Sequence, residues 1–73
     1  MNDRTYKLGD KLIYHSKVNG NDYDIEIVNI NEHRPPQQRY GVDTYCEGVY
    51  YGDVLFLSKE FLDKCEVKNE IHN

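Results

Sequence analysis

The chain has 73 residues, of which 38% are hydrophobic and 30% charged, and its formal net charge is −4. A chain this short forms at most one domain with a small core, which leaves little room for a deep catalytic cleft. The acidic balance argues against a nonspecific nucleic-acid binder, and the spread of Tyr, Val, Leu and Ile argues against disorder.

The net charge lies in the second half of the chain, because residues 1–40 hold as many basic as acidic side chains while residues 41–73 are acidic. No apolar signal stretch opens the chain, and no run reaches the roughly 20 apolar residues of a membrane span. Cys46 and Cys65 have neither C-x-x-C nor metal-ligand spacing. We therefore expect a cytoplasmic protein with reduced thiols, no metal, no cofactor and no membrane association.

The chain is expected to begin with a loosely ordered segment and a hairpin. Residues 1–7 are polar, and the run 11–17 alternates with Leu12 and Tyr14 on one face, which is typical of a strand. The stretch 18–21 contains Asn-Gly, a pair that favours the positive φ angles of tight hairpins.

A long second strand is expected at 22–34. Its apolar face runs through Ile25 and Ile27 and then changes parity to Val28 and Ile30. A change of parity exchanges the two faces of a strand, so the sequence predicts a bulge or sharp bend near Ile27 and Val28. Such a bend lets one strand serve two segments of a small barrel.

The second strand is expected to end at a proline pair. Pro35 and Pro36 have no N–H to donate to a strand ladder. Further strands are expected at 39–46 and 54–58, separated by a glycine-flanked hairpin at 47–53.

The chain is expected to close with a single turn and a short strand. Ser58 is a suitable N-cap, and 58–65 is too short for an independent helix, so a single 3₁₀ or α turn fits best. The last strand is expected at 65–68 and a flexible tail at 69–73. The expected core residues are Leu12, Tyr14, Ile25, Val28, Ile30, Val42, Leu55, Leu57, Phe61 and Val67.

This order of elements resembles the SH3-like barrel, including its Tudor and KOW-type relatives, over residues 8–68. The resemblance is carried by "LGDKLIY" near the start and "DVLFLSKEFLDKCEV" near the end, which look like the entry into the first strand and the closing strand–turn–strand of that fold. The chain also resembles small proteins encoded by bacteriophages and prophages of low-GC hosts. The resemblance implies an all-β, five-stranded barrel with a one-turn 3₁₀ helix before the last strand.

The resemblance does not carry every function of the family. The chain has no Trp and no "ALYDY"-type stretch, so polyproline binding is not implied. The segment "VNGNDYDIEIV" is neither glycine-rich nor basic, as a KOW motif would be.

The loop "NEHRPPQQRYGVD" and the tyrosines are the candidate binding features. His33, Arg34 and Arg39 flank the prolines, and Tyr50 and Tyr51 lie in the following hairpin. Arginine and tyrosine are enriched at interfaces, so we predict a partner-binding surface from these five residues. The structural alternatives are a plain strand connection for the loop, and core or strand-surface positions for the tyrosines. A cage for a methylated cation, or a base-stacking platform, is a further alternative for Tyr45, Tyr50 and Tyr51.

Catalytic and metal-binding signals are weak. The alternating carboxylates Asp22, Asp24 and Glu26 could form a metal site, but carboxylates on a strand face are more often solvated. We therefore expect a non-enzymatic binding module for a protein partner, in a monomer or weak homodimer, perhaps a phage or prophage factor acting on a host protein. The alternative hypothesis is a nucleic-acid binder that uses the basic residues of the first half, which are Lys7, Lys11, Lys17, Arg34 and Arg39.

Overall fold

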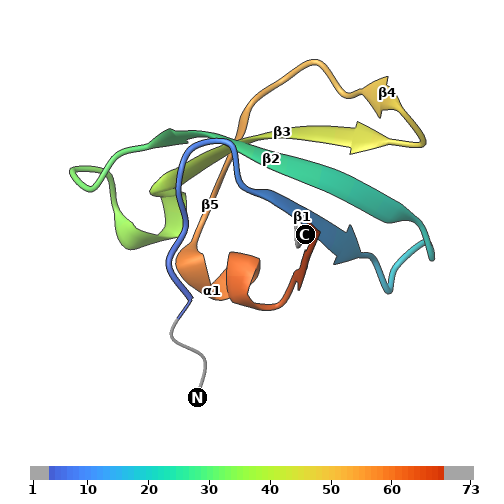
Figure 1. Cartoon of the computed structure of the whole chain (residues 1–73), viewed down its shortest axis with the longest axis horizontal. Coiled ribbons are helices and arrows are strands. Elements are labelled where there is room, and N and C mark those ends of the chain that lie inside the picture. Colours follow the sequence, from blue (N-terminus) through green and yellow to red (C-terminus); the bar gives the residue numbers. More distant parts are fainter. Residues whose placement is uncertain (1–3, 69–73) are drawn as a thin grey trace, which may run out of the picture.

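The computed structural model describes residues 4–68, and over this range the chain is predominantly β (Figure 1). The strands are β1 (Lys11–His15), β2 (Asp22–Ile30), β3 (Tyr40–Cys46), β4 (Val49–Tyr50), β5 (Leu55–Leu57) and β6 (Glu66–Val67). A 3₁₀ turn, η1 (Pro36–Gln38), lies between β2 and β3, and one helix, α1 (Lys59–Asp63), lies between β5 and β6.

The strands form one antiparallel sheet in the order β4-β3-β2-β1-β6, and β5 also pairs with β3. The sheet is open, since no strand pairing among residues 4–68 joins β5 or β4 to β6. The expected all-β class is thus confirmed, and the expected count of five strands is wrong, because β3 pairs with β5 along its first half and with β4 along its second half. Within the described range no helix is long and apolar enough to cross a membrane.

The hairpin between β1 and β2 forms where it is expected. His15 lies opposite Asp22, and the N–H of Ser16 donates to the carbonyl of Asn21 at 3.0 Å. Gly20 has a φ of 77°, a value that favours glycine, and its N–H donates to the Ser16 carbonyl.

Strand β2 contains the predicted irregularity. The register with β3 shifts between Ile27 and Asn29, so Val28 is the extra residue of a bulge. Ile25 and Ile27 before the bulge are buried, and Ile30 after it is half-buried. Val28 itself is exposed, so its expected place in the core is wrong: a bulged residue lies outside the alternation that would have turned it inward.

The loop after β2 begins earlier than the prolines predict. β2 ends at Ile30, and the N–H of Arg34 already donates to the Asn31 carbonyl in a turn. Pro35 precedes η1 as its N-cap instead of ending the strand. Pro at the start of a helix costs no hydrogen bond, because the N–H there has no partner within the helix.

The segment before the last strand is a short α-helix, which is one of the two forms that the sequence leaves open and differs from the 3₁₀ helix that the resemblance implies. The Ser58 hydroxyl accepts a hydrogen bond from the N–H of Phe61, which caps the N-terminus of α1. β6 then pairs with β1, with Val67 opposite Leu12, so the last strand lies beside the first.

The core lies between the sheet and α1. Its buried apolar side chains are Leu12, Ile25, Ile27, Val42, Leu62 and Cys65. The expected members Tyr14, Ile30, Leu57 and Phe61 pack against this core while half-buried. Besides Val28, two expected members, Leu55 and Val67, are exposed because, within the described part of the chain, their strands have no neighbour on one side.

Part of the N-terminal segment packs on α1. The Arg4 guanidinium donates to the carbonyls of Leu62 and Cys65, at 3.2 and 2.8 Å, and the Tyr6 hydroxyl donates to Asp63. Residues 1–3 of the expected loose N-terminus and the expected tail at 69–73 lie outside the described residues.

Candidate functional site

The sheet has a core face and an outer face, because side chains alternate along each strand. On β3, Val42 and Thr44 are buried in the core face, whereas Gly41, Asp43 and Tyr45 belong to the outer face. The outer face of β3 and its neighbours carries most of the features discussed below.

One end of the outer face is built around Gly41. A Cβ at this position would lie 3.0 Å from Cε1 of Phe56 and 3.3 Å from Cγ1 of Val54. Phe56 and Val54 therefore lie directly over the Gly41 backbone, where only glycine leaves them room. The Arg34 guanidinium carbon lies 4.0 Å from the centroid of the Phe56 ring, which is a cation–π contact.

The other end of the outer face is aromatic. Tyr50 lies opposite Tyr45 across β3 and β4, and their ring centroids are 5.2 Å apart. The Tyr50 hydroxyl donates to Oδ1 of Asp43 at 3.0 Å. This hydrogen bond is the main cause of the raised pKa of Tyr50, because the carboxylate stabilises the protonated phenol.

We name this row of side chains the outer-face strip; it consists of Arg34, Tyr45, Tyr50, Val54 and Phe56. It runs the length of β3, from the loop after β2 to the hairpin that joins β3 to β4. Three exposed large apolar side chains, Tyr50, Val54 and Phe56, lie along this strip, whereas the exposed Val49, Tyr51 and Leu55 of the same chain segment lie on the other face. A concentration of exposed apolar side chains of this kind marks interaction sites on soluble proteins.

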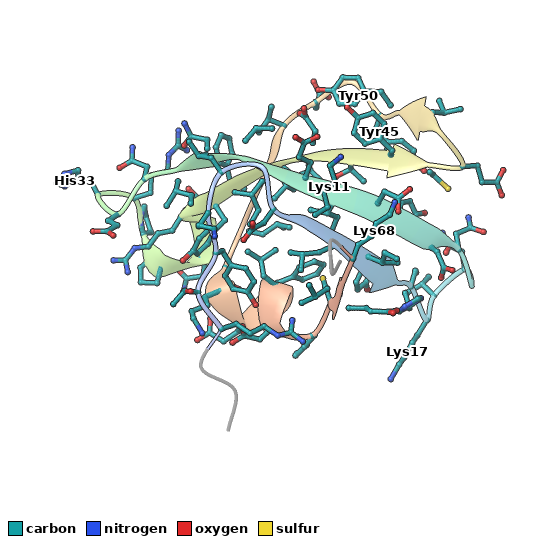
Figure 2. All side chains as sticks on the ribbon, in the orientation of Figure 1. Lys11, Lys17, His33, Tyr45, Tyr50 and Lys68 are labelled. Atoms are coloured by element: carbon teal, nitrogen blue, oxygen red, sulfur yellow. The ribbon has the colours of Figure 1, made fainter. Side chains whose placement is uncertain are left out.

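A hollow of about 330 Å³ adjoins the strip at its tyrosine end. Its lining includes Tyr45 and the side chains of Lys11, Glu26 and Lys68. The register pairs Lys11 with Glu26 and Asp24 with Tyr45, so these side chains share the outer face, and Figure 2 labels Lys11 and Tyr45 in neighbouring positions.

Charges of both signs lie beside the strip, and Lys11 lies directly opposite Glu26 on the neighbouring strand. Lys68 is paired with Asp24 at 3.2 Å. Glu26 lies directly opposite Asp43 on the neighbouring strand, and two like charges in that position repel one another.

The predicted site residues are not all brought together. Arg34 and Tyr50 both belong to the outer-face strip. Tyr51 belongs to the opposite face, where its ring packs edge-on against Tyr23 with centroids 5.7 Å apart. Arg39 follows Arg34 in the same loop, and its Nε donates a hydrogen bond to the Arg34 carbonyl at 3.0 Å. His33 is exposed at the tip of its loop, far from Tyr50 (Figure 2).

Sequence reasoning missed Phe56 and Val54 as surface residues. The apolar run "VLFLS" suggests a strand covered on both faces, whereas among residues 4–68 β5 pairs with a strand on one edge only. The signal that could have found them is Gly41, since a glycine inside a strand often marks close approach by another group.

Metal binding and thiol chemistry depend on the histidine, cysteine and acidic side chains. Among residues 4–68, no group of three or more His, Cys, Asp or Glu side chains is arranged to hold a metal ion. Cys46 and Cys65 are both free thiols, and burial raises the pKa of Cys65 to about 11, which makes its reactive thiolate form scarce at neutral pH.

The basic residues of the first half are spread over the molecule. Lys11 lies on the outer face, Lys17 lies in the turn between β1 and β2, and Arg34 lies at the far end of β3. Figure 2 shows Lys11 in the middle of the molecule and Lys17 projecting from its edge.

Comparison with known proteins gives no relative from which a function could be carried over. No protein-family model matches this chain, and no curated protein or solved structure matches it either.

Proposed function

We propose that this chain is a non-enzymatic protein-binding module that docks its partner on the outer-face strip. The observation that carries the proposal is the line of exposed Phe56, Val54 and Tyr50 along β3, with Arg34 stacked at its end. Aromatic residues and arginine are the side chains that most often dominate binding free energy at protein interfaces.

The side chains of the strip are suited to this task because several are held in place before binding. Arg34 is stacked on Phe56, and Tyr50 is fixed by its hydrogen bond to Asp43. Ordering side chains on association costs about 0.5–1.5 kcal/mol each, so side chains that are already ordered lose less on binding.

We further propose that the fold is an SH3-like barrel in a cytoplasmic protein of phage or prophage type. Support comes from the strand order: β1 to β4 pair consecutively as a meander, β5 pairs with β3, and after a short helix the last strand pairs with the first. This strand order is compatible with the SH3-like barrel proposed for residues 8–68, although no strand pairing among the described residues closes the sheet into a barrel.

The test is capture of a partner from a low-GC bacterial lysate, followed by titration of the purified pair. The double variant Arg34→Ala, Tyr50→Ala should weaken affinity by more than about tenfold, which corresponds to 1.4 kcal/mol. Tyr51→Ala is the matched control, since the ring lost there lies on the opposite face. A partner that binds the double variant unchanged, or that is lost only in the control, would show that the strip is not the docking surface.

Nucleic-acid binding is tested with the same material. Fluorescence anisotropy with short single- and double-stranded DNA and RNA at low salt detects contacts with phosphates, which weaken steeply as salt rises. We expect no binding below about 100 μM, the weak end of nonspecific affinity.

A further inference from the structure

The imidazole of His15 lies between two carboxylates that come from different strands. Its Nδ1 lies 2.8 Å from Oδ1 of Asp22 on β2, and its Nε2 lies 2.8 Å from Oε1 of Glu66 on β6. An ionised carboxylate oxygen only accepts hydrogen bonds, and a neutral imidazole has a single N–H. Both contacts are therefore hydrogen bonds only while the ring carries two protons. A neutral ring must turn one nitrogen lone pair toward a carboxylate oxygen.

The two carboxylates differ in how firmly their strands are held. Asp22 lies directly opposite His15 in the hairpin of β1 and β2, which pairs along the whole of β1. Glu66 lies on β6, a strand of two exposed residues that pairs with β1 at Leu12 and Ile13. A short strand with little buried apolar surface opens more easily than the core strands do. The contact with Glu66 is therefore the one that breaks when the ring loses a proton.

Two further contacts hold β6, and neither involves a histidine. The N–H of Lys68 donates to the carbonyl of Lys11 at 3.0 Å, and the Lys68 ammonium group pairs with Asp24 at 3.2 Å. Histidine is the side chain whose ordinary pKa places its change of charge between pH 5 and 8. His15 is therefore the contact of β6 that responds to pH near neutrality.

The charged groups that surround His15 act in opposite directions. Lys17 and Lys64 line the hollow beside the ring and oppose its protonation, whereas Asp22 and Glu66 contact the ring directly. The carboxylates prevail: the hydrogen bond to Glu66, followed by the one to Asp22, raises the pKa of His15 above 6.5. By linkage, the contact with Glu66 is fully present below the ordinary pKa and is lost as pH rises through the raised pKa.

We infer that His15 is a pH-dependent link, which holds β6 on β1 while its ring carries two protons and releases β6 when one proton passes to solvent. Release frees the edge of β1 at Leu12 and Ile13, and it takes Lys68 away from the hollow beside Tyr45. The inference goes beyond an effect on overall stability, because β6 opens while the rest of the sheet stays folded. It does not depend on the proposed function, since β6 is not part of the outer-face strip.

The first experiment measures the exchange of backbone amides with water by NMR, on the full chain at about pH 6 and about pH 8.5. Each rate is divided by that of an unstructured peptide at the same pH, which removes the intrinsic effect of pH. The resulting protection of the Lys68 amide should fall about two- to fivefold at the higher pH, the range expected for one exposed ion pair. The midpoint of this change should coincide with the titration of the His15 ring resonances. The Tyr51 amide, which donates to the Thr44 carbonyl beside β4, is the control and should change less.

The second experiment changes the partner of His15 on β6. The amide of Glu66→Gln offers both an N–H donor and an oxygen acceptor, so it can contact the ring in either protonation state. The protection of the Lys68 amide should then be nearly equal at the two pH values. Glu60→Gln, on the exposed side of α1, removes the same charge outside the link and should leave the pH response unchanged.

Three results would overturn the inference: a Lys68 amide whose protection does not change with pH, a midpoint different from that of the His15 ring, or a full pH response in Glu66→Gln. Dilute urea separates local release from global unfolding, because a local opening exposes little surface. We expect the exchange of the Lys68 amide to be nearly insensitive to urea. A strong response would show that β6 opens only with the whole domain, and it too would overturn the inference.

Discussion

The guanidinium carbon of Arg34 lies 4.0 Å from the centroid of the Phe56 ring. This contact joins the loop after β2 to β5, two segments that are distant in sequence. It covers one side of a ring that is otherwise partly open to solvent, and it holds the arginine at the end of the outer-face strip. Arg34 therefore has a structural role as well as its proposed role in binding.

The stacking predicts a measurable coupling between Arg34 and Phe56. Arg34→Ala should lower the free energy of unfolding by about 0.5–1 kcal/mol, the usual size of a partly exposed cation–π contact. In a double-mutant cycle with Phe56→Leu, the two effects should be less than additive, because either change alone removes the contact. Urea denaturation followed by circular dichroism measures all four proteins. Strict additivity would contradict the structural role.

Two leucines provide a test of the core as the structure places it. Leu62 is fully buried and Leu55 is 47% exposed, so Leu62→Ala should cost about 2–5 kcal/mol and Leu55→Ala far less. A loss of that size is a large share of the total stability of a small domain. Thermal and urea unfolding measure both variants, and the matched chemistry makes Leu55→Ala the control. Similar losses from both would mean that the Leu55 side chain is covered in solution.

His15 predicts a dependence of stability on pH. Its Nδ1 and Nε2 each lie 2.8 Å from a carboxylate oxygen, of Asp22 on β2 and of Glu66 on β6. The hydrogen bond to Glu66, followed by the one to Asp22, raises the pKa of His15 above its ordinary value of 6.5. The folded state therefore prefers the protonated ring, and this stabilisation is fully present below the ordinary pKa and is lost as pH rises through the raised pKa.

The measurement compares His15→Gln with the unmodified chain at two pH values. The Tm difference between them should be larger at about pH 6 than at about pH 8.5, which lie below and well above the ordinary pKa of histidine. His33→Gln is the control, since the His33 ring makes no ion pair among the described residues. A Tm difference that does not change with pH would show that the bridge from β1 to Asp22 and Glu66 does not form in solution.

The sequence predicts the alternating and irregular parts of the sheet well, because both depend on local side-chain order. The change of apolar parity at Val28 marks the bulge of β2, and Asn-Gly marks the first turn. Burial is predicted less well where it depends on the number of neighbouring strands. Leu55 lies in an apolar run that is typical of a central strand, yet it is exposed because β5 is at an edge.

For the candidate site, too, residue types can be read from the sequence, whereas the arrangement of the residues depends on strand pairing. Arg34 and Tyr50 can be selected from residue type alone, since exposed arginine and tyrosine favour interfaces. Their common face with Phe56 depends on the register between β3 and its two partners, β4 and β5. Tyr51 illustrates the difficulty: it follows Tyr50 in the sequence, but the alternation of side chains places it on the other face, against Tyr23.

Tyr6 predicts that the segment before β1 contributes to stability. Its hydroxyl donates to Asp63 on α1, and its ring packs edge-on against Tyr40 with centroids 5.7 Å apart. Burial, followed by the hydrogen bond to Asp63, raises the pKa of Tyr6 to about 12, so the phenol remains protonated well into alkaline conditions.

Tyr6→Phe keeps the ring contact with Tyr40 and removes only the hydroxyl, leaving the Asp63 carboxylate with its ion pair to Lys59 at 3.1 Å. We expect a loss of about 1 kcal/mol, the usual net value of a hydrogen bond, measured by urea denaturation. Tyr50→Phe is the matched control, because it removes a phenol–carboxylate hydrogen bond from a more exposed position and should cost less. If Tyr6→Phe costs no more than Tyr50→Phe, the segment before β1 does not pack on α1 in solution, and the loosely ordered N-terminus expected from the sequence would be the better description of these residues.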